Sequence, residues 1–217
     1  NAPIATTDSS NSAVDTLRPT VSIAMSSYAI KAGETADVTL TFSEAPTSFG
    51  AGDLTVGSGS ISNFAVTSDA KVYTATYTPT ADIEDATNVI SVGSTGWTDA
   101  AGNASFMVSD SSNYQVDTKF PLRAGVDTLS TQDTSPEITG TASMGAGDTL
   151  SVTVNGASYD NVAVTDGVWS VDTGALPPTS GTLGVFEQDT YSITATVTDV
   201  AGNQINDRSS GELTVTP

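Results

Sequence analysis

The sequence repeats itself at a spacing of about one hundred residues. Residues 8–19 (DSSNSAVDTLRP) recur as residues 110–121 (DSSNYQVDTKFP), an offset of 102 positions. Residues 98–103 (TDAAGN) recur as residues 198–203 (TDVAGN), an offset of 100. A period of this length matches a whole small domain and is too long for one solenoid repeat. The chain is therefore expected to contain tandem domains.

Strand-like patterning runs through both halves. Short segments alternate β-branched or aromatic residues with polar ones, as period-2 strands do, and Gly, Asn, Asp and Pro interrupt them about every 8–12 residues. The clearest segments are residues 36–42, 72–77, 150–154 and 191–197. We predict an all-β chain of two tandem Ig-like Greek-key β-sandwiches joined by a short linker. The predicted boundaries are 15–118 and 119–217, with residues 1–14 as the last strand of a preceding repeat or an N-terminal extension.

Composition excludes several classes of function. The chain has no Cys and no His, which removes thiol nucleophiles, zinc-thiolate sites and the commonest general base. Its net charge of −19 disfavours nucleic acid and anionic membranes as partners. No apolar run reaches membrane-spanning length, so membrane insertion is not expected. A carboxylate-only glycosidase remains conceivable, but no paired acids form a recognisable motif, and we predict that the chain is not an enzyme.

The acidic residues are mostly Asp, and topology predicts that several of them gather. In an Ig-type sandwich, alternate loops return to the pole where the first strand begins. The predicted set at that pole is Asp15, Glu44, Asp53, Asp99 and Asn103. Converging carboxylates repel unless a cation neutralises them, and Ca²⁺ takes six to eight oxygen ligands. A Ca²⁺ site is predicted here; an ordinary Asx-turn, or acidity that serves only solubility, is the alternative.

The same reasoning predicts a second set of ligands at the junction of the two repeats. A loop of the first repeat holds Asp82, Glu84 and Asp85, and the linker holds Asp117. The remaining candidates are Asp199, Asn203, Asp127 and Asp133. The alternative for the acidic loop is a solvated turn.

The conspicuous aromatic residues are Trp97, Trp169, Tyr73 and Tyr77. A sandwich buries one or two large rings, so we expect core positions. A stacking platform for sugars would use the same residue types.

Several motifs together resemble a known family. Residues 38–44 (VTLTFSE), Phe49, residues 53–56 (DLTV), residues 73–79 (YTATYTP) and residues 98–103 look like the bacterial Ig-like repeats of giant repeats-in-toxin adhesins. Residues 133–141 and 191–203 resemble a related Ig-like class. The resemblance implies secreted extender domains that hold an adhesive tip away from the bacterial surface and support biofilm formation. It also implies Ca²⁺ at and near the linkers, at positions matching Asp15, Asp99, Asp117 and Asp199. The second repeat departs from this pattern because it lacks the Ser43–Glu44 and Asp53 equivalents.

These observations favour one function and leave an alternative open. The favoured one is a structural spacer of a bacterial surface adhesin, extracellular and monomeric, whose partners are neighbouring Ig-like repeats of the same chain. The alternative is a ligand-binding Ig-like module for sugar, ice or a host surface.

Overall fold

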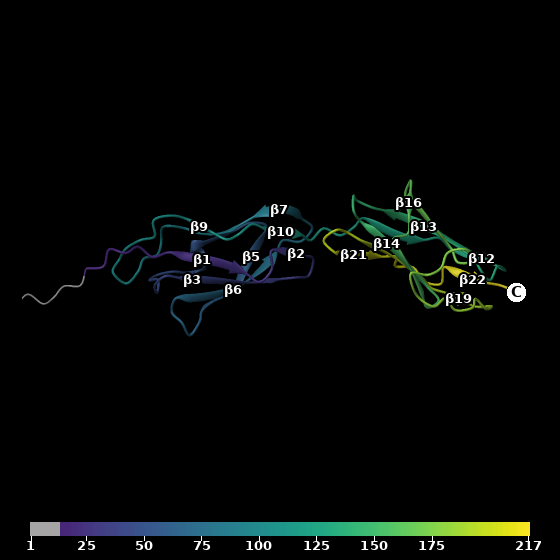
Figure 1. Ribbon diagram of the computed structural model, residues 1–217, viewed down its shortest axis with the longest axis horizontal. Helices are drawn as coiled ribbons and strands as arrows, with labels where there is room; N and C mark the ends of the chain where they lie inside the picture. The colour runs from purple at the N-terminus through teal and green to yellow at the C-terminus, as the bar shows by residue number, and fades with distance from the viewer. Residues whose placement is uncertain (1–13) are drawn as a thin grey trace, which may run out of the picture. The chain divides into compact units, whose positions relative to one another are not determined.

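The computed structural model describes residues 14–217, so residues 1–13, and with them most of the predicted strand of a preceding repeat, lie outside the described residues. The described chain is all-β, as predicted: strands are joined by turns and by one 3₁₀ turn, Ala51–Asp53 (Figure 1). Within residues 14–217 there is no helix with the length and hydropathy needed to cross a bilayer.

The chain divides into two compact units. Unit 1 contains residues 14–28, Thr35–Thr78 and Thr87–Tyr114, and unit 2 contains Ala29–Glu34, Pro79–Ala86 and Gln115–Pro217. The predicted domain boundaries, 15–118 and 119–217, stay a prediction, because the compact units exchange short segments across them.

The main sheet of unit 1 explains the alternating pattern of the sequence. In β3 (Ala36–Phe42), every second side chain from Ala36 to Phe42 is buried, and those between face outward. The antiparallel register pairs Leu40 with both Ile23 and Tyr73. The sheet order is β1 (Val21–Met25), β3, β6 (Val72–Pro79), β5 (Gly59–Val66).

Two short sheets complete the first half of the chain. One has the order β4 (Leu54–Val56), β8 (Ile90–Val92), β9 (Ser109–Asp110). The other has the order β2 (Ala29–Lys31), β10 (Tyr114–Asp117), β7 (Glu84–Asn88). In the second sheet β2 and β10 are parallel, with Val116 beside Ile30. Glu84 and Asp85 begin β7, so their predicted place in a loop is wrong: pairing with a neighbouring strand outweighs the low strand propensity of acidic residues.

The second half of the chain, from Arg123 to Pro217, contains three sheets. The first has the order β11 (Arg123–Val126), β13 (Glu137–Ser143), β17 (Val168–Asp172), β16 (Val164–Thr165). The second has the order β12 (Leu129–Thr131), β22 (Leu213–Val215), β19 (Thr190–Tyr191). The third has the order β18 (Ser180–Gly181), β15 (Ala157–Asp160), β14 (Thr149–Val154), β20 (Ile193–Thr198), β21 (Gln204–Asn206). The strand β12 runs parallel to β22, as β2 does to β10.

The large aromatic rings lie in the cores. Trp97, Trp169 and Tyr77 are at most 1% exposed, and Tyr73 is half-buried. Trp169 packs over Gly140, where a Cβ atom would come within 2.3 Å of the indole ring. The core prediction is confirmed for Trp97, Trp169 and Tyr77, which are too deeply buried to form an exposed stacking platform.

Candidate metal centre

The Asp99–Asn103 turn holds its own ligand groups in place. The backbone N–H of Asn103 donates to Asp99 Oδ1 at 2.8 Å, and the Asn103 Nδ2 group donates to Asp99 Oδ2, also at 2.8 Å. The N–H of Asp99 donates to the Asn103 carbonyl at 3.0 Å. Gly102 supplies a left-handed residue (φ +92°), which a residue with a Cβ adopts only with strain. The turn therefore fixes the Asp99 carboxylate, which is 1% exposed.

The segment before β1 is tied to this turn. Asn103 Nδ2 also donates to the Asp15 carbonyl oxygen at 3.2 Å, and Arg18 Nη1 donates to the Ala104 carbonyl at 3.1 Å. The Asp15 carboxylate accepts the Leu17 N–H at 3.0 Å through Oδ1. These bonds place the Asp15 side chain beside Asp99.

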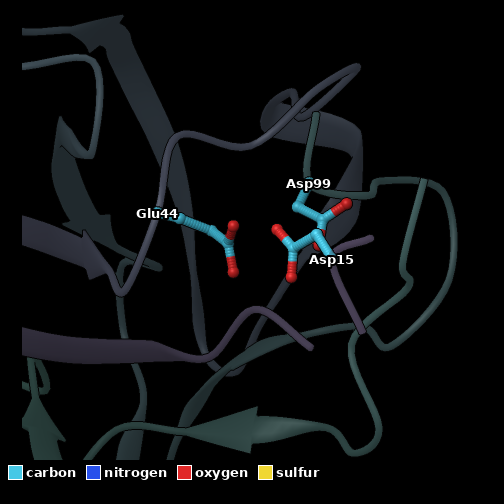
Figure 2. A group of neighbouring side chains, drawn as sticks. All are labelled: Asp15, Glu44 and Asp99. Carbon is cyan, nitrogen blue, oxygen red and sulfur yellow. The ribbon is translucent and has the colours of Figure 1, made fainter. Parts of the chain in front are cut away.

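Glu44 approaches the same point from another strand. It lies two residues beyond β3, and in Figure 2 its carboxylate extends toward those of Asp15 and Asp99. One carboxylate oxygen from each of the three residues lies within 4.8 Å of the others. The Oε1 atom of Glu44 is buried and accepts no hydrogen bond from any residue between 14 and 217. A buried acceptor without a donor is costly unless something else satisfies it.

The electrostatics of the three carboxylates are unfavourable as they stand. Burial, and then the charges of Asp99 and Asp15, raise the pKa of Glu44 above its ordinary value, and Lys71 opposes this. Lys71 itself donates to the Ser43 carbonyl at 3.0 Å. For Asp99, burial raises the pKa, but the hydrogen bonds from Asn103, Ala101 and Gly102 together outweigh it, so the pKa is lowered. Asp99 is therefore held as a carboxylate beside two further acids.

This donor set fits a hard divalent cation. The three oxygens come from carboxylates, which Ca²⁺ prefers. Two ligands on opposite sides of one Ca²⁺ ion are separated by twice the Ca–O distance of about 2.3–2.6 Å. Oxygen atoms within 4.8 Å of one another can therefore share one ion. The amide nitrogen of Asn103 donates within the turn and so positions Asp99 and Asp15. That its Oδ1 atom is a metal ligand stays a prediction.

Asp53, the fifth residue predicted at this pole, stabilises a local turn. Its Oδ2 atom accepts the Gly50 N–H at 2.8 Å and closes the 3₁₀ turn. Its Oδ1 atom lies against Gly96, where a Cβ atom would approach it to 2.5 Å. Asp53 is outside the three-carboxylate group, because a local backbone donor holds its side chain.

A second turn of the same kind lies in unit 2. Asn203 donates its N–H to Asp199 Oδ1 at 2.8 Å and its Nδ2 to Asp199 Oδ2 at 2.9 Å, and Nδ2 reaches the Asp117 carbonyl at 3.0 Å. Burial raises the pKa of Asp117, and the charges of Asp199 and Glu84 raise it further. The position two residues beyond β13, equivalent to Glu44, is Gly145. Across residues 14–217, no second set of three acids meets the distance found for Asp15, Glu44 and Asp99.

The remaining predicted ligands lie apart. Asp82 sits in a turn at φ +58° and is exposed, as is Glu84 at the start of β7. Asp127 accepts the Thr139 hydroxyl at 2.9 Å, and Asp133 accepts the Ser135 N–H at 2.8 Å. The structure does not bring these four acids together into one group.

Sequence reasoning missed Lys71, whose charge acts on Glu44. The scarcity of basic residues could have drawn attention to Lys71, because the chain has only six Lys and Arg residues in all.

A protein-family model matches the first repeat of the chain. Residues 15–116 match the model of a bacterial Ig-like domain. No protein of curated function matches the sequence.

Several solved structures are similar at low identity. A titin I-band fragment, I67–I69, is 10% identical with a TM-score of 0.44, and the match covers 92% of this chain and 66% of that one. The Escherichia coli adhesin FdeC is 12% identical with a TM-score of 0.40, covering 87% of this chain and 64% of that one. The Yersinia pseudotuberculosis adhesin InvE is 14% identical with a TM-score of 0.30, covering 87% and 57%. The chain thus spans less than two thirds of the length of each of these three structures.

The sheet topology and the family match agree on the fold: the chain is all-β and Ig-like, and its residues 15–116 match a bacterial Ig-like domain.

Proposed function

We propose that this chain is a structural spacer of a bacterial surface adhesin, extracellular, and that Ca²⁺ held by Asp15, Glu44 and Asp99 stiffens the pole of unit 1. One observation carries the proposal. Carboxylates from three separate segments converge within 4.8 Å, and one buried oxygen of Glu44 has no donor among the described residues. The bacterial Ig-like match over residues 15–116 and the internal repeat support the spacer role.

The mechanism is neutralisation of charge between segments. Asp15 precedes β1, Glu44 follows β3, and Asp99 lies between β8 and β9. Without a cation these three segments repel one another; with one, each is held to the same point. Because Asp15 lies just before the first strand, the ion would restrict the direction in which the chain enters unit 1. The expected partners are neighbouring Ig-like repeats of the same polypeptide, and the net charge of −19 makes nucleic acid an unsuitable partner.

Calorimetric titration with Ca²⁺, together with thermal unfolding in Ca²⁺ and in chelator, tests the metal. A ligand that binds only the folded state stabilises it by about 2.7 kcal/mol at one hundred times its Kd. For a domain of this size, that raises the unfolding temperature of unit 1 by about 10–20 °C.

Glu44→Gln should abolish most of this rise, and in chelator it should melt no lower than the wild type because a repulsive charge is gone. Glu137→Gln is the matched control: Glu137 is an exposed acid on β13 of unit 2 and should change neither result. Equal melting of the wild type in Ca²⁺ and in chelator would refute the metal site.

A separate measurement tests the spacer role. Small-angle scattering should give a narrower distribution of dimensions in Ca²⁺ than in chelator. If Ca²⁺ binds but the distribution is unchanged, the ion stabilises unit 1 without stiffening the chain, and the spacer mechanism is wrong.

A further inference from the structure

The two Asp-x-x-Gly-Asn turns have the same internal hydrogen bonds. In each, the Asn backbone N–H reaches Asp Oδ1 at 2.8 Å, and the Asn amide nitrogen reaches Asp Oδ2 at 2.8 or 2.9 Å. In each, the same amide nitrogen donates to the carbonyl of an aspartate 86 or 88 residues earlier in the chain. The turns are therefore equivalent parts, and a difference in what surrounds them is informative.

The turn of unit 2 receives two further hydrogen bonds. Ala32 donates its N–H to Asn203 Oδ1 at 2.9 Å, and Lys31 Nζ donates to the Gly202 carbonyl at 3.4 Å. Both donors lie in the segment Ala29–Glu34, which belongs to unit 2 in space and to the first repeat in sequence. Asn203 is 3% exposed as a result.

The turn of unit 1 has the same acceptors without these donors. Among residues 14–217, none donates to Asn103 Oδ1 or to the Gly102 carbonyl, and Asn103 remains partly exposed. An amide oxygen and a carbonyl that are both bonded in the copy of unit 2 thus receive no donor from residues 14–217 in the copy of unit 1.

The residue before Asp15 shows the same asymmetry. Val14 and Val116 occupy equivalent positions of the 102-residue repeat, each directly before the aspartate. Val116 lies in β10 beside Ile30 and is 1% exposed. Val14 is 82% exposed. An apolar side chain that the repeat buries in one copy is left in water in the other.

We propose that the pole formed by Val14, Asp15, Gly102 and Asn103 receives another Ig-like repeat of the first class, docked through a turn equivalent to Lys31–Glu34. That turn donates a backbone N–H to Asn103 Oδ1 and a lysine ammonium to the Gly102 carbonyl, and the repeat packs Val14 beside the equivalent of Ile30. The proposal rests on the spacer function above and names the partner of its pole.

Charge and sequence indicate the class of the partner. The pole of unit 1 carries three carboxylates, so a lysine on the incoming turn is complementary. The second repeat ends the equivalent strand, β12, at Thr131 and continues with Gln132 and Asp133. It offers no ammonium at the position of Lys31. The pole of unit 1 should therefore accept the first class of repeat and discriminate against the second.

The test is an extended chain in which residues 15–116 stand directly before Asp15, in place of residues 1–14. The added copy is segmentally labelled, and NMR hydrogen exchange is measured at its Ala32 amide. We expect this amide to be protected, and Asn103→Ala in the following unit to accelerate its exchange about fivefold, the effect of one net hydrogen bond. Asn203→Ala is the matched control: it should leave the added copy unchanged and accelerate exchange at the original Ala32.

Two further variants keep the test decisive if Asn103→Ala disturbs its own turn. Lys31→Met in the added copy should weaken the same protection, and an extension built from residues 119–217 should not be docked, so that its NMR relaxation reports independent tumbling. Unchanged exchange at the added Ala32 in both Asn103→Ala and Lys31→Met overturns the docking. Ca²⁺ titration of the same samples separates this result from failure of the metal site: Ca²⁺ binding without protection refutes the docking alone.

Discussion

The poles of the two units share a turn and differ in what faces it. In unit 1, Glu44 points at the turn and completes a group of three carboxylates with Asp15 and Asp99. In unit 2, Asp117 and Asp199 occupy the matching places, but Gly145 stands where Glu44 would. The turn is thus a scaffold that positions two acids in both units. The second residue after β3 or β13, which is Glu44 or Gly145, determines whether a third carboxylate oxygen joins them.

The largest expected effect comes from the ring that packs behind this pole. Trp97 is 1% exposed and lies 5.2 Å from Phe42, the last residue of β3, between ring centroids. Trp97→Ala should destabilise unit 1 by about 3–5 kcal/mol through the cavity that it leaves. It should also remove Ca²⁺ binding, because Glu44 lies two residues after Phe42, against which Trp97 packs. Trp169→Ala should cost unit 2 a similar amount. If Trp169→Ala abolished Ca²⁺ binding as well, the site would not belong to unit 1; calorimetry and two-transition unfolding curves check both.

The second-largest expected effect distinguishes the two equivalent aspartates, Asp99 and Asp199, by their contribution to Ca²⁺ binding. Asp99→Asn keeps the size of the side chain but removes one negative ligand and one of the two acceptors that Asn103 uses in the turn. The rise in melting temperature on adding Ca²⁺ should therefore largely disappear. Asp199→Asn makes the same change in unit 2 and should leave the Ca²⁺ response of unit 1 in place. Differential scanning calorimetry in Ca²⁺ and in chelator compares them. Equal losses in the two variants would mean that the poles bind the ion equally, contrary to the role assigned to Glu44.

The smallest effect contrasts buried tyrosines. Tyr77 donates its hydroxyl to the Ser58 carbonyl at 2.9 Å, whereas the Tyr159 hydroxyl is buried without a partner among the described residues. Tyr77→Phe should therefore lower the free energy of unfolding by about 1 kcal/mol, and Tyr159→Phe should be neutral or raise it. Denaturant unfolding measures both; a loss of stability in Tyr159→Phe would reveal a partner for its hydroxyl.

Tyr159 also predicts a dependence on alkaline pH. Burial raises the pKa of its hydroxyl above the ordinary value of 10.0. The unfolded chain then loses this proton first, so the stability of unit 2 should fall as the pH rises above about 10. Tyr159→Phe should flatten that fall. Unfolding curves between pH 9 and 11 would contradict the assignment if the wild type and the variant kept parallel slopes.

Much of this arrangement could be predicted from the repeat and from strand alternation. The offsets of 102 and 100 residues matched Asp15 with Asp117 and Asp99 with Asp199. The alternation in residues 36–42 placed Glu44 just beyond a strand. The topology of a sandwich then sufficed to bring Asp15, Glu44 and Asp99 to one pole.

The expectations that differ from the structure involve local hydrogen bonds or strand pairs that the sequence pattern does not show. Asp53 appears as available as Glu44 in sequence, but a backbone N–H three residues away holds its carboxylate. Glu84 was predicted in a loop because acidic residues are common in turns, yet it begins a strand. The parallel pairing of β2 with β10 joins residues more than eighty positions apart, and no local pattern records it.

That parallel pairing has a mechanical consequence. In a parallel pair formed by an early strand and the last strand, tension applied at the two ends of a repeat acts along the strands. The backbone hydrogen bonds between Ala29–Lys31 and Gln115–Asp117 then share the load in shear instead of opening one after another. The pair β12 and β22 repeats the arrangement in the second half of the chain. Each half thus contains a parallel strand pair that would resist by shear a force applied at the two ends of the repeat.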